Sequence, residues 1–314
     1  MKMRKFTDLS IFAFMLLVFA ALSIPAQRAP AAFRSITVKS EPGAAVWVDG
    51  VLFGRTAKDG TITISTVSAG VHTIRVRADG FSQIEQPLGA AQKGTINITL
   101  KKTDDPAELA FQEAERLTLV DREKAVAAYE RAIAARPKFP EAFLAMARMQ
   151  TDMGDLDDAL RSINSARKLR PGYAEATAVE GRILKEMGEE QKAIAAFKRA
   201  VAEGKGFQPE ALTGLGLLYK DRAEFAGGTG EFSEEAANYA ESAKYLRSAL
   251  KQLSGAPDAI VIYQIVGLIY ERLQRPDDAI AVYEEFLRIF PSVPEATAVR
   301  SFITQLKKTP AQPQ

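Results

Sequence analysis

The side chains that most often perform catalysis are scarce in this chain of 314 residues. It contains no cysteine and a single histidine, His72. The missing cysteines exclude disulfides, thiolate catalysis and sulfur-ligated metals. One histidine in an alternating apolar stretch is more typical of a structural or surface residue than of a metal ligand. We therefore predict no cofactor and no metal site.

Two short patterns could suggest a ligand, and both are incomplete. Gly227, Gly228 and Gly230 are clustered as in a phosphate-binding loop, but the lysine and Ser/Thr of such a loop are missing and no strand precedes them. Residues 155–158 are rich in aspartate but lack the glycine and terminal glutamate of a calcium loop. Hydrolase motifs of the Gly-x-Ser-x-Gly and His-Glu-x-x-His types are absent from the sequence. We predict a non-enzymatic protein with no catalytic residues.

The single tryptophan, Trp47, is the strongest candidate for a binding side chain in the first third of the chain. It alternates with Val46 and Val48, so it points away from them if they are buried. An exposed tryptophan could stack on a cell-envelope glycan or on a partner's side chain. The alternative is that Trp47 packs under a loop or against the helical part of the chain, because large aromatic residues are mostly buried.

Residues 34–102 show the period-2 alternation of β-strands. Alternating segments occupy residues 35–39, 45–49, 61–65, 71–77 and 94–100. Three Asp-Gly pairs, at 49–50, 59–60 and 79–80, are strong hairpin signals. This pattern predicts a small antiparallel β-sandwich.

Residues 103–294 repeat themselves with a period of 34 residues. Ala125, Ala159 and Ala193 are spaced by this period, and Tyr129 and Phe197 follow the first and last of them by four residues. A repeat of this length is typical of helix pairs that stack into a solenoid. We expect a short helix at 295–308 to cap the last pair and a disordered tail at 309–314.

One repeat carries an excess of residues at 222–239. We expect a flexible loop there, followed by a lengthened second helix. The alternative is a loop that grips a partner at the edge of the groove.

The N-terminus has the parts of an export signal. Three basic residues within 2–5 precede an apolar run at 10–24, and small residues end the segment at Ala26. We predict a signal peptide at 1–26, a linker at 27–33 and an exported, extracytoplasmic protein. The alternative is an uncleaved anchor at residues 6–24, the one case in which the chain would meet the membrane. A net charge of +2 gives no indication of nucleic-acid binding.

The β-segments resemble a PEGA domain. The resemblance covers about 65 residues and rests on motifs in the expected order: Ser40–Ala44, Val46–Gly50, Gly54–Thr56, Gly70–Val76 and Gly80-Phe81. The family's name-giving tetrapeptide stands here as Glu-Pro-Gly-Ala, and Ala57 replaces a proline. The resemblance implies a β-sandwich of envelope proteins that serves in binding or localisation.

The helical part resembles tetratricopeptide repeats (TPR), best at residues 140–173. The resemblance implies a multi-domain chain with an all-α solenoid whose first helices line a peptide-binding groove. Carried over by position, the groove residues include Arg148, Thr151, Arg182, Lys185, Lys220, Gln264 and Arg272.

Arg148 and Arg182 occupy equivalent positions, as do Lys185 and Lys220, and they would form a basic ladder for a carboxylate or an acidic peptide. The alternative is a solvated face neutralised by Asp152, Glu186 and Asp221. The asparagines of the family's carboxylate clamp are missing from these positions.

We predict a protein-interaction scaffold of the bacterial cell envelope that holds a peptide or helix in the TPR groove. The alternative function is binding of surface or cell-wall carbohydrate, with the repeats as a spacer.

Overall fold

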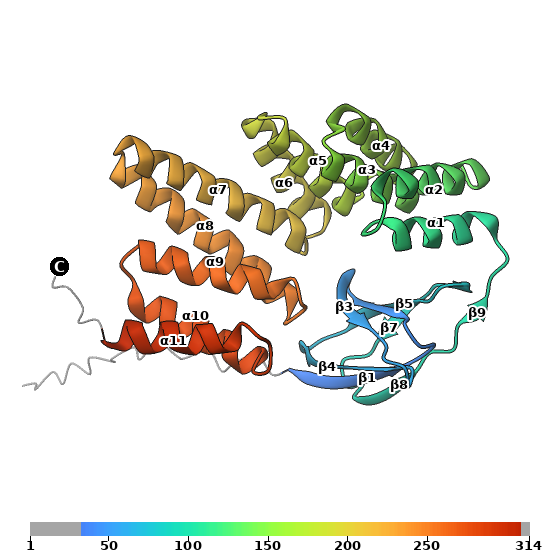
Figure 1. Ribbon diagram of the computed structural model, residues 1–314, viewed down its shortest axis with the longest axis horizontal. Helices are drawn as coiled ribbons and strands as arrows, with labels where there is room; N and C mark the ends of the chain where they lie inside the picture. The colour runs from blue at the N-terminus through green and yellow to red at the C-terminus, as the bar shows by residue number, and fades with distance from the viewer. Residues whose placement is uncertain (1–32, 309–314) are drawn as a thin grey trace, which may run out of the picture. The chain divides into compact units, whose positions relative to one another are not determined.

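The computed structural model describes residues 33–308, which belong to one compact unit (Figure 1). The predicted signal peptide, the tail at 309–314 and all of the linker except Phe33 lie outside the described residues. Within residues 33–308, no helix is both long and apolar enough to cross a membrane.

The first part is a β-sandwich built from two sheets and a short strand pair. One sheet has the order β4-β1-β8, the other β3-β2-β5-β7, and β6 pairs with β9. The strands are β1 (Arg34–Lys39), β2 (Ala45–Val48), β3 (Val51–Arg55), β4 (Thr61–Val67), β5 (His72–Arg77), β6 (Phe81–Ser82), β7 (Ile84–Leu88), β8 (Gly94–Asn97) and β9 (Lys101–Lys102). Alternating residues such as Ile36, Val38, Ile74 and Val76 fill the space between the sheets.

The sandwich differs from the sequence prediction in one pairing and in four strands, of which β6 and β9 have two residues each. β1 and β8 run parallel, so the sandwich is not wholly antiparallel. β3 and β7 were not predicted, because Gly54 interrupts the alternation of one and Pro87 lies in the other. Proline is tolerated in β7 because this strand lies at the edge of its sheet.

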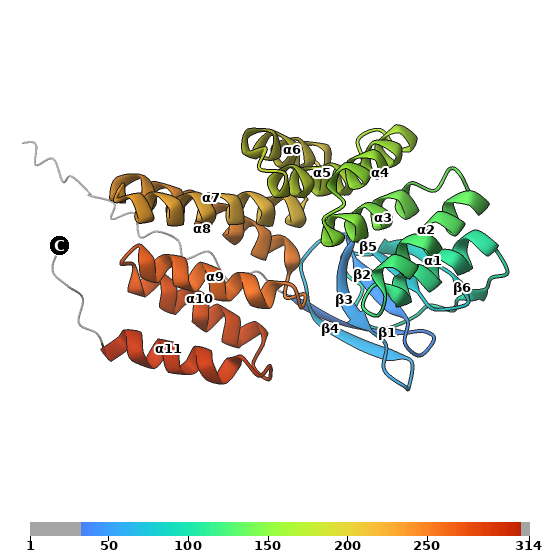
Figure 2. The same ribbon diagram turned by 45° about the horizontal axis from the view of Figure 1, so that its top comes forward.

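The second part is a series of antiparallel helix pairs (Figures 1 and 2). Five pairs follow one another along the chain, and a last helix packs on α10. The helices are α1 (Pro106–Leu117), α2 (Arg122–Ala135), α3 (Pro140–Met153), α4 (Leu156–Leu169), α5 (Ala174–Glu186), α6 (Glu190–Glu203), α7 (Pro209–Thr229), α8 (Phe232–Leu253), α9 (Ala259–Arg272), α10 (Pro276–Ile289) and α11 (Ala296–Lys308).

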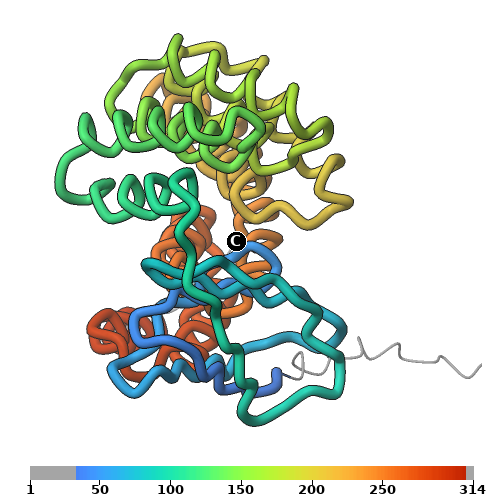
Figure 3. The backbone as a smooth tube through the Cα atoms, turned by 90° about the vertical axis from the view of Figure 1, so that its right-hand side faces the viewer, coloured from blue at the N-terminus to red at the C-terminus, as the bar shows by residue number. Residues whose placement is uncertain are grey.

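Glycine lets the two helices of a pair approach closely. A Cβ atom added at Gly267 would lie 2.2 Å from the ring of Tyr283, and one added at Gly181 would lie 2.6 Å from the ring of Phe197. Such distances are too short for any side chain, so the 34-residue spacing of small and aromatic residues reflects helix crossings. Figure 3 follows the chain from the sandwich, in blue and teal, into these pairs, from green to red.

The loop expected at 222–239 is not formed. The excess residues instead lengthen both helices of their pair, so that α7 has 21 residues and α8 has 22. The turn between them is short and centres on Gly230, whose φ of 82° is left-handed. Gly227 lies within α7, and a Cβ atom there would lie 2.8 Å from the Glu235 carboxyl group. The glycines therefore allow a close helix hairpin and form no phosphate loop.

Candidate partner-binding cavity

A cavity of about 1510 Å³ lies between the sandwich and the first helices of the repeats. Its helical wall comes from α1, α3, α5, α7 and α9. Its other wall comes from the β2–β3 hairpin and from β5. The groove predicted for the repeats is therefore shared with the β-domain of the same chain.

A polar contact fixes the β-domain to the first helix of the repeats. The Gln112 side chain on α1 is 2% exposed. Its Oε1 accepts a hydrogen bond from the Gly80 amide at 2.7 Å, and its Nε2 donates to the Phe81 carbonyl at 2.8 Å. Next to it, Arg77 on β5 forms an ion pair with Glu115 on α1. Burial raises the pKa of Glu115 despite the nearby Arg77 charge.

An apolar contact fixes the hairpin to the last repeats. Val51 at the start of β3 is 8% exposed and belongs to the buried cluster formed by α8, α9 and α10. Phe53 packs against both this cluster and the core of the sandwich. Between these two contacts, Gly50 at the hairpin tip lies close to the Glu175 carboxyl group on α5. The hairpin thus occupies part of the groove.

The predicted basic residues on the repeats are paired with acidic ones. Arg148 Nη2 lies 2.5 Å from Glu210, Arg182 Nη1 lies 3.2 Å from Asp152 and Lys185 Nζ lies 2.8 Å from Asp221. Each pair joins two different first helices. The charge of Glu210 is the main cause that raises the pKa of the Arg148 guanidinium. Nearby acids therefore neutralise these basic side chains. Two of those acids, Asp152 and Asp221, are ones that the sequence indicated.

Of the seven predicted groove residues, three line the cavity: Arg148, Arg182 and Lys185. Thr151 is buried, and its hydroxyl donates to the Ala147 carbonyl at 2.7 Å, within α3. Lys220 forms an ion pair with Glu224 along α7, at 2.7 Å. Gln264 and Arg272 lie on α9 but do not line the cavity.

Trp47 faces the cavity from β2, while its neighbours Val46 and Val48 are buried in the sandwich. The Arg75 guanidinium lies 4.6 Å from the centre of its ring, and that of Arg77 lies 5.1 Å away. Trp47 is half-buried, so it is not an open surface platform.

Arg75 differs from the other arginines that line the cavity because no acidic side chain pairs directly with it among the described residues. Among residues 33–308 it forms no ion pair and no hydrogen bond, and its Nε atom is buried. Burial lowers the pKa of the Arg75 guanidinium, and the charge of Arg77 lowers it further. Sequence reasoning missed Arg75. The available signal was its alternation with Arg77 on a strand that pairs with the strand of Trp47.

Several apolar side chains also line the cavity. Leu52 on β3, Leu217 on α7 and Val261 and Ile265 on α9 line it. Val261 is 59% exposed, and Leu268, one helical turn beyond Ile265, is 56% exposed. Spacings of four and three residues place Val261, Ile265 and Leu268 on one helix face. This stripe is suited to an apolar segment of a partner.

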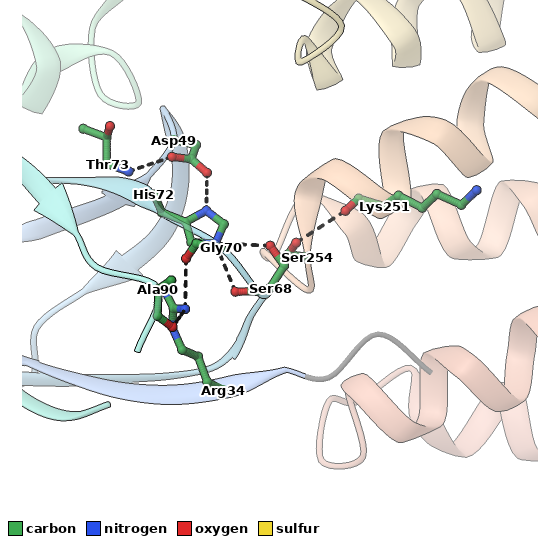
Figure 4. A network of polar contacts seen from close by, with 9 residues as sticks. All are labelled: Arg34, Asp49, Ser68, Gly70, His72, Thr73, Ala90, Lys251 and Ser254. Carbon is green, nitrogen blue, oxygen red and sulfur yellow. Dashed lines mark hydrogen bonds and ion pairs between the residues drawn. The ribbon is translucent and has the colours of Figure 1, made fainter. Parts of the chain in front are cut away.

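His72 lies outside the cavity lining and has a carboxylate partner that the sequence did not reveal (Figure 4). Its Nδ1 lies 2.6 Å from Asp49 Oδ2, and its Nε2 lies 3.0 Å from the Ser68 carbonyl oxygen and 3.3 Å from the Ser68 hydroxyl. Asp49 also accepts a hydrogen bond from the Thr73 amide at 2.8 Å. The ring therefore ties the β2–β3 turn to the β4–β5 loop, a structural role.

In the part of the chain that the structure describes, no three acidic or histidine side chains converge as the ligands of a metal ion would.

The fold and cavity define a β-sandwich joined to a helical repeat array of the interaction type, and family comparisons give the same division. The PEGA domain family matches residues 33–104. Tetratricopeptide repeat families match residues 121–183, 174–202 and 234–294. The chain therefore carries a PEGA domain followed by tetratricopeptide repeats.

Solved structures resemble about two thirds of the chain. Yeast Tom70 has a TM-score of 0.50 at 15% identity, over 65% of this chain and 40% of that one. A thermophilic TPR protein of Thermus thermophilus has a TM-score of 0.46 at 19% identity, over 65% of this chain and 100% of that one. MamA has a TM-score of 0.42 at 22% identity, over 62% and 96%. The likeness to Tom70 is one of fold, and none of the curated proteins matches the sequence.

Proposed function

We propose that this protein is an exported scaffold of the bacterial cell envelope that holds a peptide segment or helix of a partner protein in the cavity. TPR arrays are protein-interaction modules and are typically non-catalytic, and PEGA domains are typical of extracytoplasmic proteins. The observation that carries the proposal is the exposed apolar stripe of α9 beside a cavity of about 1510 Å³. A cavity of this size exceeds the roughly 300–1,000 Å³ of small-molecule sites.

The β-domain has a double role in this proposal. It localises the protein, and it forms one wall of the cavity through Trp47, Leu52 and Arg75. A partner segment would therefore contact both domains. The surroundings of Trp47 do not favour the alternative of a surface carbohydrate site. Its ring faces a cavity, and the guanidinium groups of Arg75 and Arg77 lie over it.

The proposal is tested by affinity capture from envelope extracts with the full chain as bait. The doubly substituted V261E/L268E bait places two charges on the apolar stripe. The control is L119E, which alters a side chain that is 97% exposed and outside the cavity lining. We expect one or more partners to be captured by the wild type and by L119E and lost with V261E/L268E. Equal capture by all three baits would contradict a working groove.

Export is tested separately. Residues 1–32 fused to alkaline phosphatase, which is active only after export, should yield active enzyme. Intact mass of the exported full chain should show cleavage after Ala26. An unchanged N-terminus in a membrane fraction would favour the anchor at residues 6–24.

A further inference from the structure

The Arg75 guanidinium lies in an unusual setting for a charged group. It is half-buried, its Nε is shielded from solvent, and among the described residues it is neither ion-paired nor hydrogen-bonded. Removing a cation from water costs several kcal/mol. The cation–π contact with Trp47 returns part of this cost. The Trp47 contact therefore does not fully offset the cost of keeping Arg75 in place.

None of the neighbouring acids forms a direct ion pair with Arg75 among the described residues. Arg77, on the same face of β5, is ion-paired with Glu115, so this pair carries no net charge. Glu85 is the cross-strand neighbour of Arg75, and Glu175 projects from α5. Both attract Arg75 electrostatically, but neither is within ion-pair distance of it. Arg75 therefore lies beside Trp47 without a direct acidic partner, although the Glu85 and Glu175 charges act on it from a distance.

The stacking geometry keeps the Arg75 donors available. A guanidinium that lies over an aromatic ring uses its flat face, while its N–H groups point outward from its edge. These N–H groups form a fork that matches the two oxygens of a carboxylate. Contact with the Trp47 ring, 4.6 Å from the guanidinium carbon, restricts the Arg75 side chain before a ligand arrives, which reduces the entropy lost on binding.

We propose that Arg75, held on Trp47, binds one carboxylate of a partner peptide whose neighbouring apolar side chains pack on Leu217, Val261 and Ile265. This inference rests on the proposed function and names the ligand class: a segment with apolar residues around a single carboxylate. The carboxylate is that of an Asp or Glu side chain or that of a chain terminus. The β-domain, rather than the repeats, supplies the charge that selects this ligand.

The test uses Trp47 as its own reporter, because it is the chain's single tryptophan. The full chain is titrated with four probes while tryptophan emission is recorded. N-acetyl-Leu-Glu-Leu-amide and its Gln counterpart test a side-chain carboxylate. N-acetyl-Leu-Leu as the free acid and as the amide test a terminal carboxylate.

We expect a saturable change in emission with at least one acidic probe. The matching neutral probe should bind about tenfold more weakly or worse, because a charge-assisted pair is lost. Which acidic probe binds better identifies the source of the carboxylate. Equal binding of acidic and neutral probes, or no response to any probe up to about 10 mM, a concentration above the millimolar range of a single anchored contact, would overturn the proposal.

Three variants separate recognition from folding. Arg75→Gln should weaken the binding of the acidic probe about tenfold. Arg75→Lys keeps the charge but loses the fork, and it should bind with intermediate affinity. The control, Arg55→Gln, removes the same charge from an arginine outside the cavity lining and should bind like the wild type. Unchanged binding by R75Q would overturn the proposal.

The two proposals fail in different ways. If V261E/L268E loses a captured partner while R75Q retains it and binds the acidic probe normally, the groove functions but the carboxylate site is wrong. If the acidic probe binds through Arg75 while capture is unaffected by V261E/L268E, the anion site is real and the partner contacts another surface.

Discussion

The basic side chains of the repeats and Arg75 of β5 line the same cavity, but they differ in whether an acidic side chain pairs with them. Arg148, Arg182 and Lys185 each contact an acid on another first helix. Arg75 lies over the Trp47 ring and, among residues 33–308, forms no ion pair. In the repeats, ion pairs join first helices of different pairs, whereas Arg75 of the β-domain has no such ion pair among residues 33–308. A basic residue in a groove therefore indicates a ligand site only when its acid is missing.

The comparison requires that the β-domain be docked on the repeats, and Val51→Asp should break this docking. A carboxylate in the buried cluster of α8, α9 and α10 has no cationic partner, and the expected loss is roughly 3–5 kcal/mol in the free energy of unfolding. Urea unfolding measures it. Leu52→Asp is the control, because the adjacent Leu52 is 42% exposed and should cost less than about 1 kcal/mol. Similar losses for both would mean that the hairpin is not inserted.

The polar contact at the other end of the cavity should be weaker but measurable. Gln112→Ala leaves the Gly80 amide and the Phe81 carbonyl without their partner, and a loss of about 1–3 kcal/mol is expected. Glu113→Ala, on the exposed face of the same helix, removes a surface ion pair with Arg131 and should cost under about 1 kcal/mol. Thermal unfolding of both variants would show whether α1 holds the β-domain.

The contrast between paired and unpaired arginines can be sharpened with a matched pair of variants. Arg148→Met leaves Glu210 without its cation, and since both side chains are over one-third exposed, the loss should be only about 0.5–1 kcal/mol. Arg75→Met removes a charge that nothing neutralises, so the stability should be unchanged or raised by up to about 1 kcal/mol. If R75M is clearly the more destabilising, Arg75 has a structural partner and the contrast fails.

The smallest effect concerns salt. Arg182→Met should cost less than about 0.5 kcal/mol, because its pair with Asp152 is solvent-exposed and 3.2 Å long. The difference from the wild type should vanish in about 1 M NaCl, where the screening length is about 3 Å. A larger loss of stability that salt does not reduce would contradict this expectation. It would show that the buried Nε and Nη2 atoms of Arg182 stabilise the fold in addition to the ion pair.

Much of the fold could be predicted from the sequence, because it depends on local periodicity. The 34-residue spacing of Ala125, Ala159 and Ala193 indicated the helix pairs, and alternation with Asp-Gly turns indicated the sandwich. These patterns are local consequences of helix and strand geometry. A lengthened second helix, α8, was expected, but the extension of α7 was missed because glycines in 227–230 are typical of loops, although only Gly230 ends a helix.

The cavity and its free charge were decided by tertiary structure. Arg148 and Arg182 were correctly placed on first helices, but their acids come from other repeats, 62 and 30 residues away along the chain. The position of Arg75 on Trp47 depends on strand register, and its lack of an acid depends on how the β-domain docks. Sequence determines which side chains can carry charge, whereas the distances between them, on which electrostatic energy depends, exist only in the folded chain.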